Sequence, residues 1–287
     1  MYNPATSLRR LSQSLSTNAK SLSWSCSVFF LLTLGLTAGW TLDAQAESPE
    51  TAPPQLKDVL TQIDAAANRR DVKAIAQFYS ANFKNSDGLT RASMEKVLSK
   101  FWERYSQVNY RTELRDWKSE GNGIVAETVT HITGTQASDN LSMKLDSTLR
   151  SRQRFEGQKI VQQDILAERT QLTSGANPPV VEVNLPEQVR IGQQFNFDVI
   201  VKEPLGDGFL LGTALEEPIK PELYTKPADF ELELLPAGGI FKVGKAPVRA
   251  ENRWISAVLI RGDGMTLITQ RLQVVDRPST STTKSSP

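Results

Sequence analysis

The stretch Thr90 to Tyr105, TRASMEKVLSKFWERY, decides the fold that we expect for the first half of the chain. Its apolar side chains recur three, four, seven, eight and eleven residues after the first of them, the spacing that places side chains on one face of an α-helix. Thr90 is a typical N-cap residue. We therefore predict an amphipathic helix whose aromatic face must lie on a broad partner. That face consists of Met94, Val97, Leu98, Phe101, Trp102 and Tyr105.

After residue 108 apolar and polar residues alternate with a period of two, which is typical of half-buried strands. Short turns such as Glu156-Gly157-Gln158 separate the strands. Closely spaced strands of this kind favour an antiparallel, strongly bent sheet. With two further helices expected before residue 90, the pattern indicates an α+β fold of three helices on a curved sheet. The expected helices are residues 56–69 and 72–80, and the expected strands are 108–115, 124–133, 141–154 and 159–170.

Residues 55–171 resemble the NTF2-like (SnoaL-like) superfamily. The resemblance is carried by DVKAIAQFYSANFKNSDG at residues 71–88, by the FWERY end of the long helix, and by the hairpin RFEGQKIVQQDILAER at residues 154–169. In that superfamily three helices close a conical cavity over the sheet, and many members form homodimers through the sheet. Members range from isomerases and dehydratases to non-catalytic binding domains. The resemblance therefore implies a cone-shaped fold and not one activity.

The first 46 residues are predicted to be an export signal. Basic residues precede an apolar core, Val28 to Trp40, and Ala44-Gln45-Ala46 supplies the small-x-small pattern that signal peptidase recognises. Cleavage would place the protein outside the cytoplasm, in a periplasm, a lumen or the medium, with no membrane span left. The alternative is an uncleaved, single N-terminal membrane anchor.

The rest of the chain is expected to contain a second domain. Residues 47–54 are predicted to be a disordered spacer, 172–179 a linker and 277–287 a disordered tail, because Pro, Gly, Glu and small polar residues dominate them. Between linker and tail, residues 180–276 show six short strand patterns and no long helix. This spacing favours an all-β sandwich. In general plan it resembles bacterial immunoglobulin-like domains, with Trp254 as the candidate core tryptophan.

Composition excludes several classes of function. The net charge is +1, and removal of the leader would change it to about −1, so a nucleic-acid partner is not expected. Cys26 is the only cysteine and lies in the leader, which excludes disulfides, cysteine nucleophiles and thiolate metal sites in the mature protein. With one histidine in the whole chain we expect no metal site, and without a glycine-rich phosphate loop we expect no nucleotide cofactor.

Candidate catalytic residues are few. His131, the only histidine, could act as a general acid or base if a carboxylate oriented it. The alternation of its strand leaves open which face of the sheet it occupies. Tyr79, Tyr105 and Tyr110 could reach a cavity together with Asp87, Asp116 or Asp164. A tyrosine with a carboxylate is similar to the combination that ketosteroid isomerases of this superfamily use, without one pair being singled out. The competing interpretation is that the aromatic residues only fill the space between helix and sheet.

We expect a non-catalytic binding or assembly protein whose cone takes a small apolar ligand or a segment of a protein partner, with the sandwich as a docking module. The alternative is an isomerase- or lyase-type enzyme that uses a Tyr/Asp or His/Asp pair in the cone. An open cavity in which a tyrosine and a carboxylate converge would favour the enzyme. The predicted pocket residues are Phe78, Tyr79, Phe83, Met94, Leu98, Phe101, Trp102, Tyr105, Tyr110 and Leu114.

Overall fold

The computed structural model describes residues 46–136, 142–204, 208–226, 229–235, 238–262 and 264–276, all of which belong to one compact unit. The predicted export signal up to residue 45 and the predicted tail at 277–287 lie outside the described residues. Within the described ranges, no helix is both long and apolar enough to cross a membrane.

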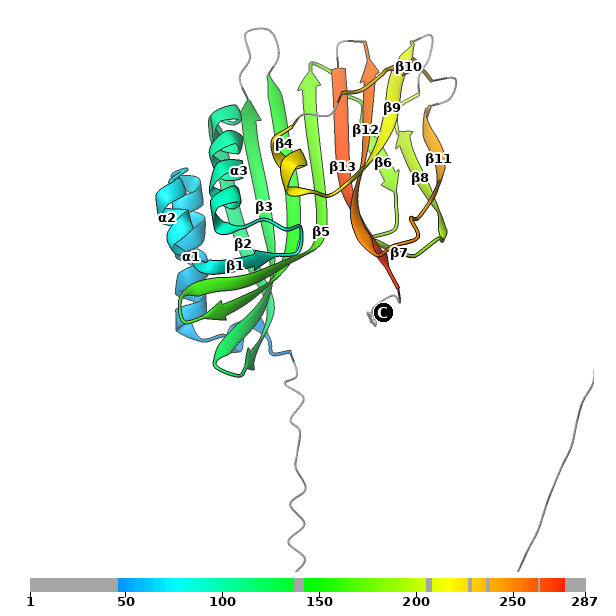
Figure 1. The fold of residues 1–287 in the computed structure, drawn as a ribbon. Coiled ribbons are helices and arrows are strands. Elements are labelled where there is room, and N and C mark those ends of the chain that lie inside the picture. Colours follow the sequence, from blue (N-terminus) through cyan, green and yellow to red (C-terminus); the bar gives the residue numbers. More distant parts are fainter. Residues whose placement is uncertain are drawn as a thin grey trace, which may run out of the picture. The chain divides into compact units, whose positions relative to one another are not determined.

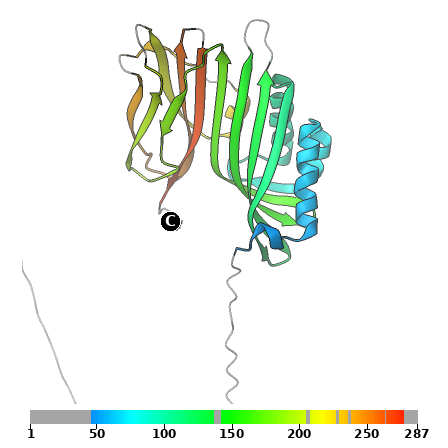
Figure 2. The same ribbon diagram turned by 180° about the vertical axis from the view of Figure 1, so that it is seen from behind.

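Three α-helices lie along one face of a large sheet (Figures 1 and 2). Helix α3 (Arg91–Arg104) begins directly after Thr90, whose hydroxyl accepts a hydrogen bond from the Ser93 amide while the Ser93 hydroxyl accepts one from the Thr90 amide. This capping box fixes the start of the helix, and the helix predicted around residues 90–105 is confirmed. The helices are α1 (Pro54–Asn68), α2 (Val72–Gln77) and α3 (Arg91–Arg104), with short 3-10 helices η1 (Pro49–Thr51) and η2 (Pro221–Thr225).

Ten strands form one continuous sheet in the order β10-β9-β12-β13-β5-β4-β3-β2, with β1 parallel to β5 and β7 parallel to β13. Strands β2 to β5 pair in antiparallel fashion in the order of the sequence, and this is the part of the sheet that the helices cover (Figure 1). The strands are β1 (Tyr79–Asn85), β2 (Gln107–Glu120), β3 (Gly123–Gln136), β4 (Met143–Glu156), β5 (Lys159–Gly175), β7 (Gln188–Arg190), β9 (Leu210–Pro218), β10 (Glu233–Leu234), β12 (Glu251–Arg261) and β13 (Gly264–Val275).

Three register shifts in β2 and β5 change which residues face the helices. In β2 the pairing with β3 skips Arg115, and in β5 the pairing with β4 skips Val161 and Leu166. An extra residue in one strand bends the strand and breaks its alternation. As a result Trp117 is buried under α1, and Glu168 lies on the same face of the sheet as Ile165.

The C-terminal part of the chain continues the same sheet. Strand β13 pairs with β5 over the stretch from Gly264↔Gly175 to Gln270↔Arg169. The predicted linker at 172–179 is therefore wrong in its first four residues, which form the end of β5. The first three of these residues also pair with β4. Hydrogen bonds from two neighbouring strands outweigh the local preference of Gly and Ser for turns and loops.

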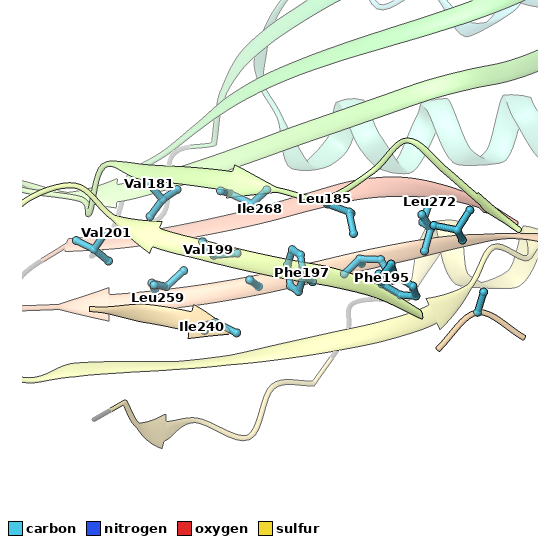
Figure 3. Packing of buried hydrophobic residues seen from close by; sticks show 14 of the residues in the cluster. Val181, Leu185, Phe195, Phe197, Val199, Val201, Ile240, Leu259, Ile268 and Leu272 are labelled. Carbon is cyan, nitrogen blue, oxygen red and sulfur yellow. The ribbon is translucent and has the colours of Figure 1, made fainter. Parts of the chain in front are cut away.

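A second, three-stranded sheet packs against the C-terminal strands. Its order is β11 (Gly239–Lys245), β8 (Gln194–Val201) and β6 (Val181–Asn184). Phe195, Phe197 and Val199 of β8 are buried in one apolar core with residues of β12 and β13 (Figure 3). The two sheets thus enclose a core of their own. Strands β7 and β11 are additional to the strand patterns expected from the sequence.

The predicted disordered spacer at 47–54 is wrong. Glu47 exchanges two backbone hydrogen bonds with Trp117, at 2.7 and 3.2 Å. The indole nitrogen of Trp117 also donates to the carbonyl oxygen of Ser48 at 3.1 Å, and Ala52 is buried. Strand β2 lies at the edge of the sheet, so its free backbone groups and the Trp117 side chain need hydrogen-bond partners. The hydrogen bonds to Trp117 therefore hold this Pro- and Glu-rich segment in place.

Candidate functional site

A cavity of about 830 Å³ lies between helix α3 and the sheet. Its wall is built from α1, α3, strands β1 to β5 and the segment of η2, so residues from both parts of the chain contribute to it. The cavity combines an apolar helical wall with a largely polar sheet wall.

Helix α3 supplies the apolar wall. Trp102 and the adjoining Tyr105 are only 5% and 4% exposed. Met94, Leu98 and Phe101, on the same helical face, stay half-buried because they border the cavity instead of a packed core. The aromatic residues Phe101 and Trp102 therefore pack in an apolar cluster with α1 and α2 and also border the cavity.

The opposite wall carries hydroxyl, amide and carboxylate groups. Asp64 of α1 accepts hydrogen bonds from the backbone amide of Thr112 at 2.7 Å and from its hydroxyl at 2.6 Å. Ser147 and Thr170 share a hydrogen bond of 2.7 Å between neighbouring strands. Most of these groups thus have protein partners, and both oxygens of Asp64 are engaged.

The C-terminal part of the chain closes the cavity through η2. Tyr224, Thr225 and Lys226 all line it. The Tyr224 hydroxyl donates a hydrogen bond of 2.5 Å to Asp87, and its ring packs edge-on against Trp254 with centroids 4.8 Å apart. These contacts hold η2 over the opening between α3 and β5. Trp254, expected as the core tryptophan of the C-terminal domain, instead packs beside the cavity.

A buried cluster of ion pairs stabilises the position of η2 through the Asp87 side chain to which Tyr224 donates. The Arg271 guanidinium donates two parallel hydrogen bonds of 2.8 Å to the two carboxylate oxygens of Asp87 and a third of 3.1 Å to Glu168. The side chains of Arg271 and Asp87 are fully buried. Trp254 Nε1 also donates to Glu168 Oε2 at 3.1 Å. The cluster therefore joins the loop before α3 to strands β5, β12 and β13.

Each charge in the cluster is stabilised by the others. Burial acts to raise the pKa of Asp87, but the hydrogen bonds and charge of Arg271, with the Tyr224 hydrogen bond, outweigh it and hold that pKa below its ordinary value. Burial acts to lower the pKa of Arg271, yet Asp87 and Glu168 raise it overall. Both groups are therefore charged at neutral pH.

Besides Tyr224, three further tyrosines line the same cavity. Burial raises the pKa of Tyr79 to about 12. Burial also raises the pKa of Tyr110, although the hydrogen bond of 3.0 Å that Trp102 Nε1 donates to its hydroxyl acts in the opposite direction. Burial raises the pKa of Tyr105 as well. All three remain protonated, and able to donate hydrogen bonds, well above neutral pH.

The predicted pocket residues divide into two groups. Phe78, Phe83 and Leu114 are absent from the cavity wall and pack in the adjoining apolar cores. In the case of Phe83 the side chain faces away because it belongs to a strand, β1, where the sequence indicated a connection. The remaining predicted residues do line the cavity: Tyr79, Met94, Leu98, Phe101, Trp102, Tyr105 and Tyr110.

Of the candidates Tyr105, His131 and Asp87, only Tyr105 lines the cavity. His131 lies on the opposite face of β3, since its neighbours Thr130 and Ile132 line the cavity, and its Nδ1 is 3.5 Å from the Thr148 hydroxyl. Asp87 is fully engaged in the buried cluster. The structure therefore corrects the expected Tyr/Asp and His/Asp pairs built on Asp87 and His131. Across the described ranges, no three His, Cys, Asp or Glu residues are grouped to hold a metal ion.

Four polar wall or cluster residues lie outside the set predicted from the sequence. Glu168 reaches the cavity only because Leu166 is skipped in the pairing of β5, and strict alternation would have placed it on the outer face. Arg271 and Tyr224 come from the C-terminal part and meet Asp87 across 184 and 137 positions of sequence. Asp64 is one of several polar residues on α1, and only its contact with Thr112 distinguishes it.

Comparison with known proteins gives three results. Residues 176–275 match a family described as "Domain of unknown function (DUF8623)". No curated protein matches the chain. Several solved structures resemble about two fifths of the chain.

Among these structures is a putative scytalone dehydratase from Novosphingobium aromaticivorans, with 10% identity over 39% of this chain and 80% of that chain and a TM-score of 0.33. A hypothetical protein with a ketosteroid isomerase-like fold from Catenulispora acidiphila has 14% identity over 42% of this chain and 85% of that chain, with a TM-score of 0.28. Bd1075 of Bdellovibrio bacteriovorus has 14% identity over 38% of each chain, with a TM-score of 0.28. The first two of these neighbours are NTF2-like in type, and the resemblance extends over about two fifths of the chain.

Proposed function

We propose that this protein binds a small, largely apolar ligand in the cavity between α3 and the sheet, without catalysing a reaction. The observation that carries the proposal is the cavity itself, about 830 Å³ in volume with half-buried Met94, Leu98 and Phe101 along one wall. Pockets for small molecules in proteins are roughly 300–1,000 Å³, mostly apolar, with a few convergent polar groups.

The small number of candidate acid and base residues in the cavity supports the proposal that the protein does not catalyse a reaction. His131 and Asp87 do not line the cavity, and both carboxylate oxygens of Asp64 accept hydrogen bonds from Thr112. A general base must lie within hydrogen-bond reach of the proton that it removes, whereas Asp64 is held against Thr112 at 2.6 and 2.7 Å. These contacts position Asp64 as a structural partner of the edge strand.

Location and partners are further parts of the proposal. The export signal that the sequence predicts for residues 1–46 supports a site of action outside the cytoplasm. The two sheets that enclose the C-terminal core support an interpretation of this region as an immunoglobulin-like docking module for a protein partner. Association of two copies through the outer face of the β2–β5 sheet is the corresponding proposal for a homodimer.

A fluorescence titration with N-phenyl-1-naphthylamine, an uncharged apolar dye, tests binding in the cavity. The wild-type protein should bind the dye saturably, and Leu98→Trp, which places a larger side chain in the cavity, should weaken that binding by about tenfold. Leu211→Trp is the matched control, because Leu211 is exposed on β9. Absence of saturable binding by the wild type, or equal binding by Leu98→Trp, would contradict the proposal.

A second candidate function is acid–base catalysis next to a carbonyl group. It is favoured by the neutral phenols of Tyr79 and Tyr110, which share the cavity with the carboxylate of Glu168. Such an enzyme would exchange the α-protons of cyclohexanone with deuterium from the solvent, and Tyr110→Phe would slow the exchange by about a hundredfold. Exchange no faster than in buffer would exclude this class of reaction for that ketone and leave binding as the function.

A further inference from the structure

The buried cluster behind the cavity contains more negative than positive charge. The guanidinium of Arg271 is matched by Asp87, with which it makes two parallel hydrogen bonds of 2.8 Å. Glu168 adds a second carboxylate 3.1 Å from the same guanidinium. One positive charge against two negative charges leaves one negative charge uncompensated.

The uncompensated charge is accessible from the cavity through Glu168. The side chains of Arg271 and Asp87 have no exposed surface, whereas 19% of the Glu168 side chain is exposed, and Glu168 lines the cavity. Trp254 and Arg271 both donate to the same oxygen, Oε2. Among the described residues, the other oxygen, Oε1, has no hydrogen-bond partner.

The protein's other cations near the cavity do not neutralise Glu168. Lys100, Arg104 and Lys226 line the cavity. In the part of the chain that the structure describes, however, Arg271 is the only cation within ion-pair distance of Glu168. A carboxylate in a partly enclosed space loses hydration, so it gains most from a positively charged partner that enters the same space.

We propose that the ligand of this cavity carries an ammonium group that pairs with Glu168 while its apolar part lies along α3. The inference rests on the proposed function, because it names the chemical class of the ligand that the cavity binds. Trp254 and Arg271 fix the carboxylate before the ligand arrives, which lowers the entropic cost of binding. The half-buried side chains of α3 supply the apolar contact surface.

Isothermal titration calorimetry of the mature chain with three probes that share an octyl group tests the inference. Octylammonium should bind about tenfold or more tightly than either 1-octanol or octanoate, since a charge-assisted hydrogen bond is about twice as strong as a neutral one. Glu168→Gln keeps the shape and a hydrogen-bond acceptor, and it should remove the preference for octylammonium while leaving 1-octanol affinity within about twofold. Glu103→Gln is the matched control, because Glu103 lines the same cavity outside the cluster, and it should keep the preference.

The possible failures are distinct. If none of the three probes binds, both this inference and the proposed function are overturned. If the three bind alike, or if Glu168→Gln keeps the preference, the inference alone is overturned and binding of apolar ligands stands. Should Glu168→Gln not fold, the comparison of probes on the wild-type protein decides: preference for octylammonium supports the inference, and its absence overturns it.

Discussion

Arg271 is the residue on which the interior around the cavity depends most. Its side chain is fully buried, and it holds Asp87 from the loop before α3 and Glu168 from β5. A buried ion pair contributes little compared with a well-packed apolar pair, but removing one partner leaves the other charge buried without compensation. Loss of Arg271 therefore destabilises the folded protein because it leaves the carboxylates of Asp87 and Glu168 without a positive partner.

We expect Arg271→Met to lower the free energy of unfolding by roughly 3–5 kcal/mol. Urea denaturation followed by tryptophan fluorescence measures the change. Arg111→Met is the control, because the Arg111–Glu113 pair has side chains 66% and 38% exposed and surface pairs contribute about 0–1 kcal/mol. Equal effects of the two substitutions would contradict the role assigned to Arg271.

The tyrosines of the cavity predict loss of stability at alkaline pH. The pKa of Tyr79 is raised from 10.0 to about 12, so between these pH values the folded protein holds a proton that the unfolded chain has lost. The contribution of Tyr79 is complete below pH 10 and disappears as pH rises toward 12. Urea denaturation across this range should show a steeper loss of stability for the wild type than for Tyr79→Phe, by up to about 1 kcal/mol per pH unit. Parallel profiles would show that Tyr79 titrates normally in the folded state.

At the scale of elements, helix α1 protects an edge of the large sheet. Strand β2 is the last strand at that edge, and exposed edges attract other strands. Asn68 of α1 accepts a hydrogen bond of 2.7 Å from the Tyr110 amide and donates one of 3.0 Å to its carbonyl oxygen. Asp64 accepts from the amide of Thr112, and Glu47 pairs with Trp117. Side chains of α1 and the backbone of Glu47 thus occupy the positions that a further strand would use.

Replacing Asn68 by Ala should expose the backbone of β2 locally. Loss of one hydrogen bond of this kind corresponds to roughly 0.5–1.5 kcal/mol, so exchange of the Tyr110 amide hydrogen should become about tenfold faster. Hydrogen exchange measured by NMR gives the rate for that amide. Asn109→Ala, an exposed change on the same strand, should leave it unaltered. Unchanged exchange in Asn68→Ala would mean that the helix does not protect the edge.

Helices and strands could be predicted from the sequence where residues close together in the chain determine them. The spacing of apolar residues after Thr90 and the capping residue itself fixed α3. Strand β1 was missed, and the predicted helix at 72–80 ends at Gln77, because Tyr79 to Asn85 becomes a strand only through parallel pairing with β5. That pairing connects residues about eighty positions apart, and nothing in the short sequence YSANFKN indicates it.

At the scale of the whole molecule, the two parts that the sequence separates share one sheet. Strand β5 pairs with β4 on one side and with β13 on the other, and the Arg271 cluster crosses the same boundary. The sequence indicated each part, but it did not indicate that β13 pairs with β5. The sequence of β13 has the pattern of an ordinary alternating strand, in which Arg271 would be one of the outward polar residues. The cavity was predicted from α3 and the sheet, whereas its closure by η2 depends on the pairing of β13 with β5, which are distant in the sequence.

One cooperative unfolding transition is expected from this continuity. Differential scanning calorimetry of residues 47–287 should give a single peak whose calorimetric enthalpy equals the van't Hoff enthalpy. Two independent domains joined by a linker would give two transitions. Two well-separated peaks would therefore contradict the continuity of the sheet across β5 and β13.

The claim that one cavity is lined by both α3 and η2 is tested most directly by an NMR titration with 1-octanol. We predict that the methyl signals of Met94 and Leu98 and the amide signal of Thr225 shift together with one dissociation constant, because all three residues line the cavity. The methyl signals of Leu211, which is exposed on β9, should not move. Octanol-dependent shifts that spare Met94 and Leu98, or that leave Thr225 unchanged while α3 responds, would contradict the account.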